Sequence, residues 1–384
     1  MPNIYFDHAS TTPLHPEVLS VMMDIYQGPP GNPSSTHSFG RTAKRHLTQA
    51  RDRIAAVVGC HPSELMFTSG GTESDNTALR GTLNALRHTG KRHLITSSAE
   101  HHAVLHTSKR LEEEGYSITL LEPDGDGIIS PEKVQNALRE DTTMISLLYV
   151  NNEVGTIQPI AEIGAVAREA GVLFHVDGVQ ALGSIRLNLH ELPVDLMSFT
   201  AHKINGPQGI GALYIAKSVP FQPQIVGGSQ EGKRRAGTEN TASATGFAKA
   251  VELSDEHFEE KNRHISLLRE TFIHGLEAEL GSSAFVINGH KERSVPHILN
   301  ISLLGADTET LLMNLDMEGI AASSGSACTS GSLERSHVLK AMSLPPDRLN
   351  SAVRFSFGLG NTLKEIEYAV KKIATILNRI RSKV

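Results

Sequence analysis

Short apolar runs rich in β-forming residues alternate with helix-length amphipathic segments between residues 64 and 216. The runs expected to be strands are 64–69, 93–98, 117–122, 143–150, 172–177, 195–200 and 211–216. The segments expected to be helices include 101–115, 131–139 and 159–171. This alternation is typical of an α/β fold with a mainly parallel central sheet and helices on both faces.

The pattern changes after about Phe247. A long charged helical stretch covers 249–280 and is followed by sparser strand signals and a closing helix. These later elements are expected at 285–288, 297–303, 352–357 and from about Thr362 onward. We therefore predict a large α/β domain over residues 15–248. A smaller α+β domain would combine 1–14 with 249–384 and carry a loop at about 323–334.

Charge and cysteine content exclude several classes of protein. Lys and Arg number 36 against 42 Asp and Glu, a net charge of −6, which provides no basic field for a nucleic acid. The two cysteines, Cys60 and Cys328, cannot form a disulfide framework, and this favours a reducing compartment such as the cytoplasm. No apolar run approaches the roughly 18 residues of a membrane span, and no secretory leader is recognisable.

Cys328 lies in the segment SSGSACTSGS at 323–332, which consists almost entirely of small polar residues and glycine. Such residues cannot build a core, so the segment is predicted to be an exposed, mobile loop. An exposed thiol is a chemical liability unless the protein uses it, which makes Cys328 a candidate nucleophile. Cys60 follows the apolar residues VVG and is interpreted as a small buried residue.

The first polar cluster at a strand end is SGGTES, after the run 64–69. Ligands of open parallel sheets bind beyond the carboxyl ends of the strands. Thr72 is expected to cap the following helix, whose backbone N–H groups would suit a phosphate. The alternative is a plain junction between a loop and a helix. The segment matches neither GxGxxG nor GxxxxGK[ST], which disfavours dinucleotide and P-loop sites.

Two further strand ends carry reactive side chains. Asp177 closes the run 172–177, where a buried carboxylate needs a cationic partner, and Gln180 follows three residues later. The alternative interpretation is that Asp177 caps a helix. The segment SFTAHKINGPQG presents Thr200, His202 and Lys203. Desolvation can lower a lysine pKa toward that of a Schiff-base nucleophile. The alternative for Lys203 is an amine that extends to solvent.

The segment EHHAVLHTS contains three histidines. His102 and His106 share one helix face, as zinc ligands would, but no HExxH glutamate or cysteine accompanies them, and we predict no metal. His101 could lie over a flat aromatic ligand and transfer protons, or simply cap the helix.

A phosphate cradle, a buried acid and a lysine are the groups that hold pyridoxal 5′-phosphate. The chain resembles the cysteine desulfurases of the NifS/IscS type, class-V aminotransferase-like proteins with the fold-type I architecture of pyridoxal phosphate enzymes. The matching stretches are YFDHASTTP, GNPSSTHSFG, FTSGGTESDN, EHHAVL, VNNEVGTIQPI, HVDGVQ, SFTAHKINGPQGIGALY, RRAGTEN, SSGSACTSGSLE and VRFSFG.

The resemblance implies a role for each site residue. Lys203 would bind the coenzyme aldehyde, Asp177 the ring nitrogen and Gln180 the ring hydroxyl, with His101 stacked on the ring. The implied phosphate ligands are Gly71, Thr72, Thr200, His202 and, from the neighbouring subunit of a homodimer with shared active sites, Thr238. The implied ligands of the substrate carboxylate are Asn152, which is also implied to contact the coenzyme, and Arg354, the latter through a bidentate fork.

The implied reaction transfers sulfur from L-cysteine to Cys328, leaving an enzyme-bound persulfide and L-alanine. The sulfur would then pass to an acceptor such as an iron–sulfur scaffold or a tRNA-thiolating enzyme. Two alternatives stay open: a selenocysteine lyase or other lyase or aminotransferase that uses the same coenzyme, and a non-catalytic sulfur carrier. Leu359 and Gly360 stand where relatives often carry a basic or aromatic residue, so the mouth of the pocket is expected to differ.

Overall fold

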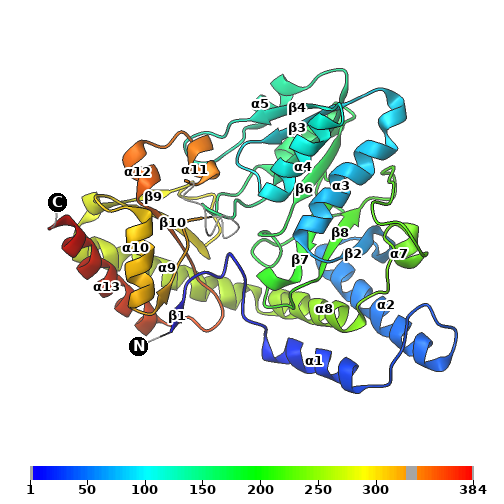
Figure 1. Cartoon of the computed structure of the whole chain (residues 1–384), viewed down its shortest axis with the longest axis horizontal. Helices are drawn as coiled ribbons and strands as arrows, with labels where there is room; N and C mark the ends of the chain where they lie inside the picture. The colour runs from blue at the N-terminus through cyan, green and yellow to red at the C-terminus, as the bar shows by residue number, and fades with distance from the viewer. Residues whose placement is uncertain (1–2, 326–334, 383–384) are drawn as a thin grey trace.

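A mixed seven-stranded sheet forms the centre of the larger half of the molecule (Figure 1). The computed structural model describes residues 3–325 and 335–382. The strands, in spatial order, are β2 (Leu65–Thr68), β8 (Gly211–Ile215), β7 (Leu196–Thr200), β6 (Leu173–Asp177), β5 (Thr142–Leu148), β3 (His93–Ser97) and β4 (Ser117–Leu121). β8 runs antiparallel to both neighbours and the other pairs are parallel. The seven predicted strands and the mainly parallel sheet are confirmed.

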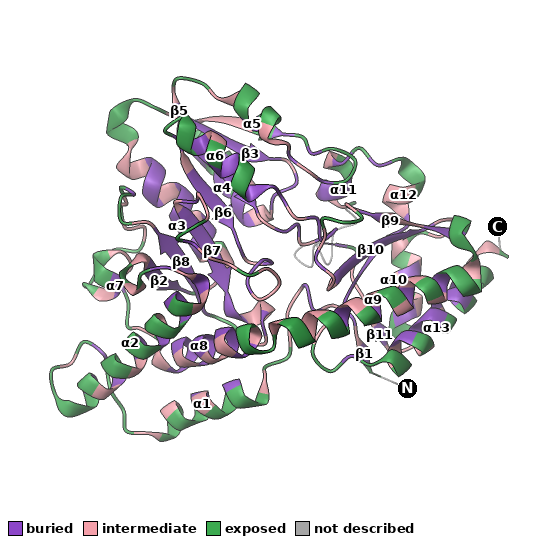
Figure 2. Cartoon of the chain, turned by 180° about the vertical axis from the view of Figure 1, so that it is seen from behind, coloured by how far each residue is buried: buried purple, intermediate pink, exposed green. Residues whose placement is uncertain are grey.

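Helices cover both faces of this sheet, as predicted. Alternate strand residues point to opposite sides, so Phe67 and Phe174 join one core while Met66 and Leu94 join another. The first core is closed by α2 (Ser38–Val58), α5 (Pro131–Ala137), α6 (Ile160–Glu169) and α8 (Thr241–Glu256). The second is closed by α3 (Gly71–Ala85) and α4 (His102–Glu113). Figure 2 shows the buried strands between helices whose outer faces are exposed.

Two helices near the start of the chain were not anticipated, α1 (Pro16–Gln27) and α2. The signal for α2 was present in the sequence, because its buried residues recur every three or four positions: Ala43, Leu47, Ala50, Ile54 and Val58. Both helices pack against α8.

A second sheet with its own core lies in the other half of the molecule (Figure 1). Its strands are β9 (Phe285–Asn288), β10 (Ile298–Leu303) and β12 (Ala352–Ser356), all antiparallel. The helices of this half are α9 (Phe258–Leu280), α10 (Thr308–Met317), α11 (His337–Ala341), α12 (Pro346–Asn350) and α13 (Leu363–Arg381). β1 (Ile4–Tyr5) pairs with β11 (Ile320–Ala321), which places Phe6 in the same core.

The single helical stretch predicted over 249–280 is in fact two helices. α8 ends at Glu256 and α9 begins at Phe258, with His257 between them. His257 has φ −97° and ψ 15°, outside the α-helical range, so the chain bends there. Among the described helices, none is both long and apolar enough to cross a membrane. The boundary between the two predicted domains stays a prediction.

Candidate active site

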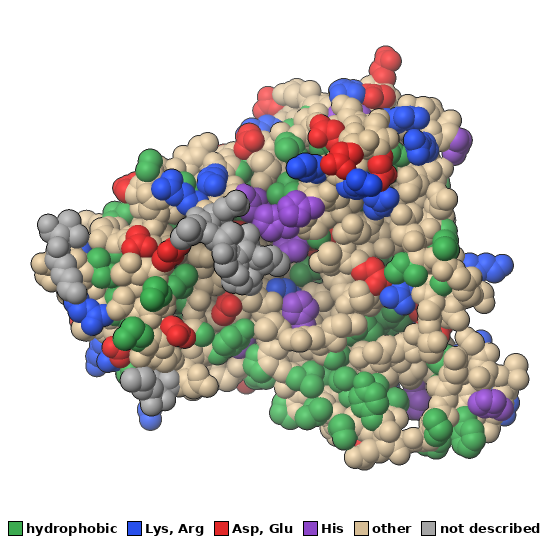
Figure 3. All heavy atoms as spheres, in the orientation of Figure 1, with side chains coloured by type: hydrophobic (Ala, Val, Ile, Leu, Met, Phe, Trp, Pro, Cys, Tyr) green, Lys and Arg blue, Asp and Glu red, His purple; other side chains and the backbone are tan. Residues whose placement is uncertain are grey.

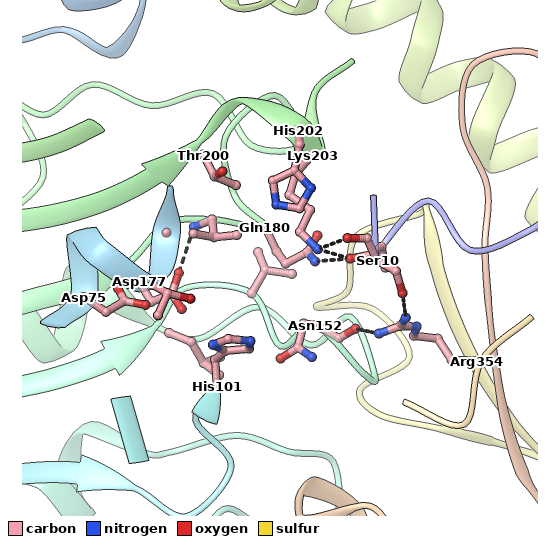
Figure 4. A pocket seen from close by; sticks show the side chains of 16 residues that line it. Ser10, Asp75, His101, Asn152, Asp177, Gln180, Thr200, His202, Lys203 and Arg354 are labelled. Atoms are coloured by element: carbon pink, nitrogen blue, oxygen red, sulfur yellow. Dashed lines mark hydrogen bonds between the residues drawn. The ribbon is translucent and has the colours of Figure 1, made fainter. Parts of the chain in front are cut away.

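A cavity of about 230 Å³ opens at the carboxyl ends of β5, β6 and β7 (Figure 4). Ten of the twelve predicted site residues line it: Gly71, Thr72, His101, Asn152, Asp177, Gln180, Thr200, His202, Lys203 and Arg354. Thr238 lines a different cavity, and Cys328 lies outside the described residues. Segments more than 280 residues apart in the sequence therefore converge on one hollow, where parallel-sheet proteins bind ligands.

The start of α3 forms one wall of this cavity. The helix begins at Gly71, and Gly70 is its N-cap, so the N-cap predicted at Thr72 is wrong. Gly70 has φ 151°, a conformation that residues with a side chain avoid. In the described part of the chain, no side chain caps this helix through a hydrogen bond. Its first turn consequently presents uncapped N–H groups and a positive dipole end, the arrangement that binds phosphate.

The backbone at Gly71 approaches the opposite wall closely. A Cβ atom built at this position would lie 2.6 Å from Cγ2 of Val179. Thr200 and His202 come from the end of β7 and the turn that follows it. Their side chains, together with Thr72, give hydroxyl and imidazole groups at the same end of the cavity. This donor set matches an anionic group.

Asp177 ends β6 and is 7% exposed. Its Oδ1 accepts a hydrogen bond from the Val179 amide at 2.9 Å, so it caps the following turn as well as facing the cavity. Burial raises the pKa of Asp177 to about 6, while the Val179 amide and Lys203 act in the opposite direction. A cationic group in the cavity would therefore stabilise the ionised carboxylate.

Two buried acids were missed: Asp75, which lines the cavity, and Glu100, which follows β3. Asp75 on α3 is 1% exposed, and its Oδ1 lies 3.7 Å from Nε2 of His175. Burial and then Asp177 raise its pKa well above the usual range. Glu100 accepts a hydrogen bond from Ser97 at 2.8 Å, and burial raises its pKa to about 8. The sequence signal for Asp75 was its spacing of four from Leu79, which places an acid on the apolar face of the helix.

His101 caps α4 and lines the cavity, so both interpretations of this residue apply. Its Nδ1 accepts from the Ala103 amide at 3.1 Å, which assigns the proton of the neutral ring to Nε2. Burial, followed by the charge of Lys203, lowers the pKa of His101 to about 4. The ring is therefore neutral at pH 7.

His102 stacks on His106 at 5.0 Å between ring centroids and lies 4.5 Å from His337. Within residues 3–325 and 335–382, no three His, Cys, Asp or Glu side chains are arranged to hold a metal ion. The absence of a metal remains a prediction. Cys60 is buried, as predicted, and burial raises the pKa of its thiol to about 12.

The segment DHAS at 7–10 contacts reactive groups from both halves of the molecule and was not assigned a role beforehand. The Ala9 carbonyl accepts from Nζ of Lys203 and from Nε2 of Gln180, the latter at 2.9 Å. The Ser10 carbonyl accepts from Nζ of Lys203 at 2.7 Å (Figure 4). The amine is thus held at the cavity by two backbone oxygens.

Arg354 lies on β12 and is 1% exposed. Its Nη2 donates to Oδ1 of Asp7 at 2.8 Å and to Oγ of Ser10 at 2.7 Å, and its Nη1 donates to the Asn152 carbonyl at 2.8 Å. Three of its five N–H groups are therefore used, and the buried Nε has no hydrogen-bond partner within residues 3–325 and 335–382. A bidentate grip on a substrate carboxylate, as predicted, requires Asp7 or Ser10 to release Nη2.

Thr238 lines a cavity of about 190 Å³ beside β2. A third cavity, lined by Ser69, Gly71 and Thr72, shares residues with both this cavity and the catalytic one. Thr238 therefore lies beyond the end of the first cavity that Thr72, Thr200 and His202 line. It does not join the other ten residues within one chain.

Two ion pairs fasten the segment that carries Thr238. Glu231 accepts two hydrogen bonds from Arg51, both at 2.8 Å, and one from the Phe67 amide at 2.9 Å. Arg235 pairs with Glu73 at 2.9 Å. Glu231 has φ 46°, a left-handed conformation that is unfavourable for a residue with a side chain. The contacts of its buried carboxylate hold it there.

A mixed, mainly parallel sheet that presents an amine, a buried acid and an anion cradle at its strand ends defines the fold-type I class of enzymes. The family model described as "Aminotransferase class-V" matches residues 4–369, and the chain belongs to this family. Within the family, the resemblance to cysteine desulfurases of the NifS/IscS type is confirmed by the relatives.

Three of these relatives cover nearly the whole chain. "Putative cysteine desulfurase IscS 1" of Bacillus subtilis (strain 168) is 47% identical over 381 residues, covering 99% of this chain and 100% of that protein. "Cysteine desulfurase IscS" of Dictyoglomus turgidum is 43% identical over 379 residues, covering 99% and 95%. A solved structure titled "NIFS-LIKE PROTEIN" superimposes with a TM-score of 0.92 at 36% identity, covering 98% and 100%.

Proposed function

We propose that this protein is a pyridoxal phosphate-dependent cysteine desulfurase, which converts L-cysteine to L-alanine and leaves a persulfide on Cys328. The observation that carries the proposal is the convergence of Lys203, Asp177 and the uncapped start of α3 on one cavity, in a chain whose relatives are named cysteine desulfurases. The alternative of a non-catalytic sulfur carrier gives no reason for this constellation.

The residues of the cavity fit the coenzyme. The close approach of Gly71 to Val179 and the uncapped helix start form a cradle that suits its phosphate, with Thr72, Thr200 and His202 around it. The Asp177 carboxylate and the Gln180 amide suit the ring nitrogen and ring hydroxyl. When bound, the coenzyme supplies an electron sink for the bonds at the substrate α-carbon.

Two side chains are suited to move protons. Nζ of Lys203 lies against the Ala9 and Ser10 carbonyls, and as a free amine it would accept the α-proton of the substrate. His101, neutral at pH 7, presents its Nε2–H to the cavity and can return a proton toward L-alanine. The buried Arg354 and the nearby Asn152 would fix the substrate carboxylate.

The sulfur step belongs to Cys328, which lies outside the described residues. Its thiolate would attack the sulfur of L-cysteine, forming an S–S bond as the Cβ–S bond breaks. The carbon fragment gains a proton and leaves as L-alanine. The persulfide sulfur would then pass to an acceptor protein, such as an iron–sulfur scaffold or a tRNA-thiolating enzyme. Low cysteine content supports the cytoplasm as its compartment.

Two features support a homodimer with shared active sites. α1 exposes Leu19, Met23 and Tyr26, which are 48%, 41% and 64% exposed and share one face of the helix. Figure 3 shows apolar side chains gathered on the lower part of the molecule, where Figure 1 places α1. Thr238 does not line the catalytic cavity of its own chain, as expected for a residue that serves the site of a neighbouring subunit.

Replacement of Cys328 tests the proposed function. The Cys328→Ser enzyme should keep the coenzyme absorbance of the wild type while forming neither persulfide nor alanine from L-cysteine. Unchanged turnover would instead favour a lyase or aminotransferase in which the thiol is a spectator.

Borohydride reduction of the purified protein followed by peptide mass mapping tests the coenzyme linkage. The coenzyme mass should be found on Lys203. A tag on another residue, or a colourless protein with no tag, would refute the assignment.

A further inference from the structure

A cavity of about 400 Å³ lies between the end of α8, the first turns of α9 and the loop 358–360. It shares no lining residue with the catalytic cavity. Its apolar lining includes Ile204, Leu253 and Leu359. Cavities of this size, mostly apolar with a few polar groups, are typical of small-molecule sites.

Lys261 on α9 lines this cavity, and its buried amine contacts Ser254, which lines the cavity as well. Its Nζ donates to the Gly183 carbonyl at 2.5 Å and to Oγ of Ser254 at 3.3 Å, and both acceptors are neutral. An ammonium group has three N–H donors, so one of them has no acceptor among the residues that the structure describes. Burial lowers the pKa of Lys261 to about 8, with no opposing contribution from an acid.

The surroundings of Lys261 supply no counter-charge. Throughout the part of the chain that the structure describes, Lys261 has no carboxylate oxygen within 4 Å. The acid that lines the cavity, Glu260, has a side chain 83% exposed. His257 and His264 line the same cavity. Arg269, farther along α9, is also largely buried and bonded to the Ile298 carbonyl, and burial lowers its pKa to about 10. A buried cation without an anion is unfavourable, and a bound carboxylate would relieve that cost.

We propose that this cavity binds a small monocarboxylate with an apolar body, whose carboxylate accepts the unused N–H of Lys261. The apolar lining would hold the body, and the cationic side would select the charged group. Such a ligand would lie against Ile204, which directly follows Lys203, and against the loop that follows β12. The inference is independent of the desulfurase reaction.

Calorimetric titration of the holoenzyme with 4-phenylbutyrate tests the site. We expect a dissociation constant of about 1 mM at pH 7, the magnitude that ligand efficiency allows for twelve heavy atoms. The uncharged 4-phenylbutanamide and the Lys261→Met variant should each weaken binding at least about tenfold, because a charge-assisted hydrogen bond is lost. Since the amine is protonated below its pKa, affinity should also fall at least about tenfold between pH 7 and pH 9.5.

Three variants make the outcome decisive. Lys371→Met, on the exposed side of α13, should bind like the wild type. Arg354→Gln, which removes the carboxylate partner in the catalytic cavity, should bind like the wild type as well. Lys261→Arg keeps the charge and should retain most of the affinity. This variant serves as the test if Lys261→Met fails to fold. Equal binding by wild type and Lys261→Met, binding lost in Arg354→Gln, or no binding at 10 mM would overturn the proposal.

Discussion

The Glu231→Gln substitution removes the charge that fastens the segment carrying Thr238. The Glu231 side chain is 2% exposed and its carboxylate accepts three hydrogen bonds, two from Arg51 and one from the Phe67 amide. A glutamine has one acceptor oxygen and cannot satisfy all three donors. Gln tolerates the local φ as well as Glu does, so backbone strain is unchanged. Breaking one partner of a buried pair costs about 3 kcal/mol, and we expect a loss of this size.

Urea unfolding followed by far-UV circular dichroism measures this loss. Protein and coenzyme concentrations must be held fixed, because ligand binding and association both shift apparent stability. The control is Glu252→Gln, since Glu252 on α8 forms a 3.4 Å pair with Arg53, which lies on α2 as Arg51 does, but these two side chains are 36% and 47% exposed. It should change stability by less than about 0.5 kcal/mol. A loss below about 1 kcal/mol for Glu231→Gln, or equal losses for the two variants, would refute the reasoning.

Three further changes have defined outcomes. Gly71→Ala should weaken coenzyme binding about tenfold in an absorbance titration, because the new Cβ would lie 2.6 Å from Cγ2 of Val179. Adding Val179→Ala should restore coenzyme binding, and a double variant that still binds weakly would contradict the steric reason. Glu100→Gln should stabilise the apoprotein by about 3 kcal/mol at pH 8.5 and little at pH 4. Burial raises the Glu100 pKa to about 8, so the wild type loses stability as pH rises from 4.5 to 8. An equal change in stability at both pH values would argue against this. Asp7→Ala should raise KM for L-cysteine about tenfold with kcat within about twofold, because Arg354 loses the acidic partner at 2.8 Å that orients its guanidinium, while Ser10 is the contact that gives way to the substrate. An unchanged or lower KM would show that Asp7 does not orient Arg354.

Much of the fold was predictable because its signals are local. The seven strands of the main sheet are short apolar runs, and every position in β3, β5 and β7 is buried. A run of that kind specifies its own structure. The capping of α3 was not predicted correctly, because the feature that favours glycine at the N-cap is the backbone conformation of Gly70, with φ 151°, which the sequence does not encode locally. The close packing with β8 constrains Gly211 instead, since a Cβ there would lie 2.8 Å from the Cα of Gly70.

The candidate site divides in the same way. Asp177 and Lys203 stand at strand ends, where a general rule places ligands, and the structure puts both in one cavity. Asp7 and Ser10 could not be assigned, because their importance depends on contacts with Arg354 on a strand of the other half. No spacing within the sequence encodes that meeting. The roles of the individual site residues remain proposals for the experiments above.

The ion pair between Asp7 and Arg354 joins positions 347 residues apart. Synthesis on a ribosome delivers these positions at opposite ends of the elongation period, and chains fold progressively as they emerge. The contacts of Lys203 with Ala9 and Ser10 can form earlier than the guanidinium contact. A nascent chain would therefore form the contacts of the Lys203 amine first. The Arg354 guanidinium, proposed to hold the substrate carboxylate, would join the site only after β12 has left the exit tunnel.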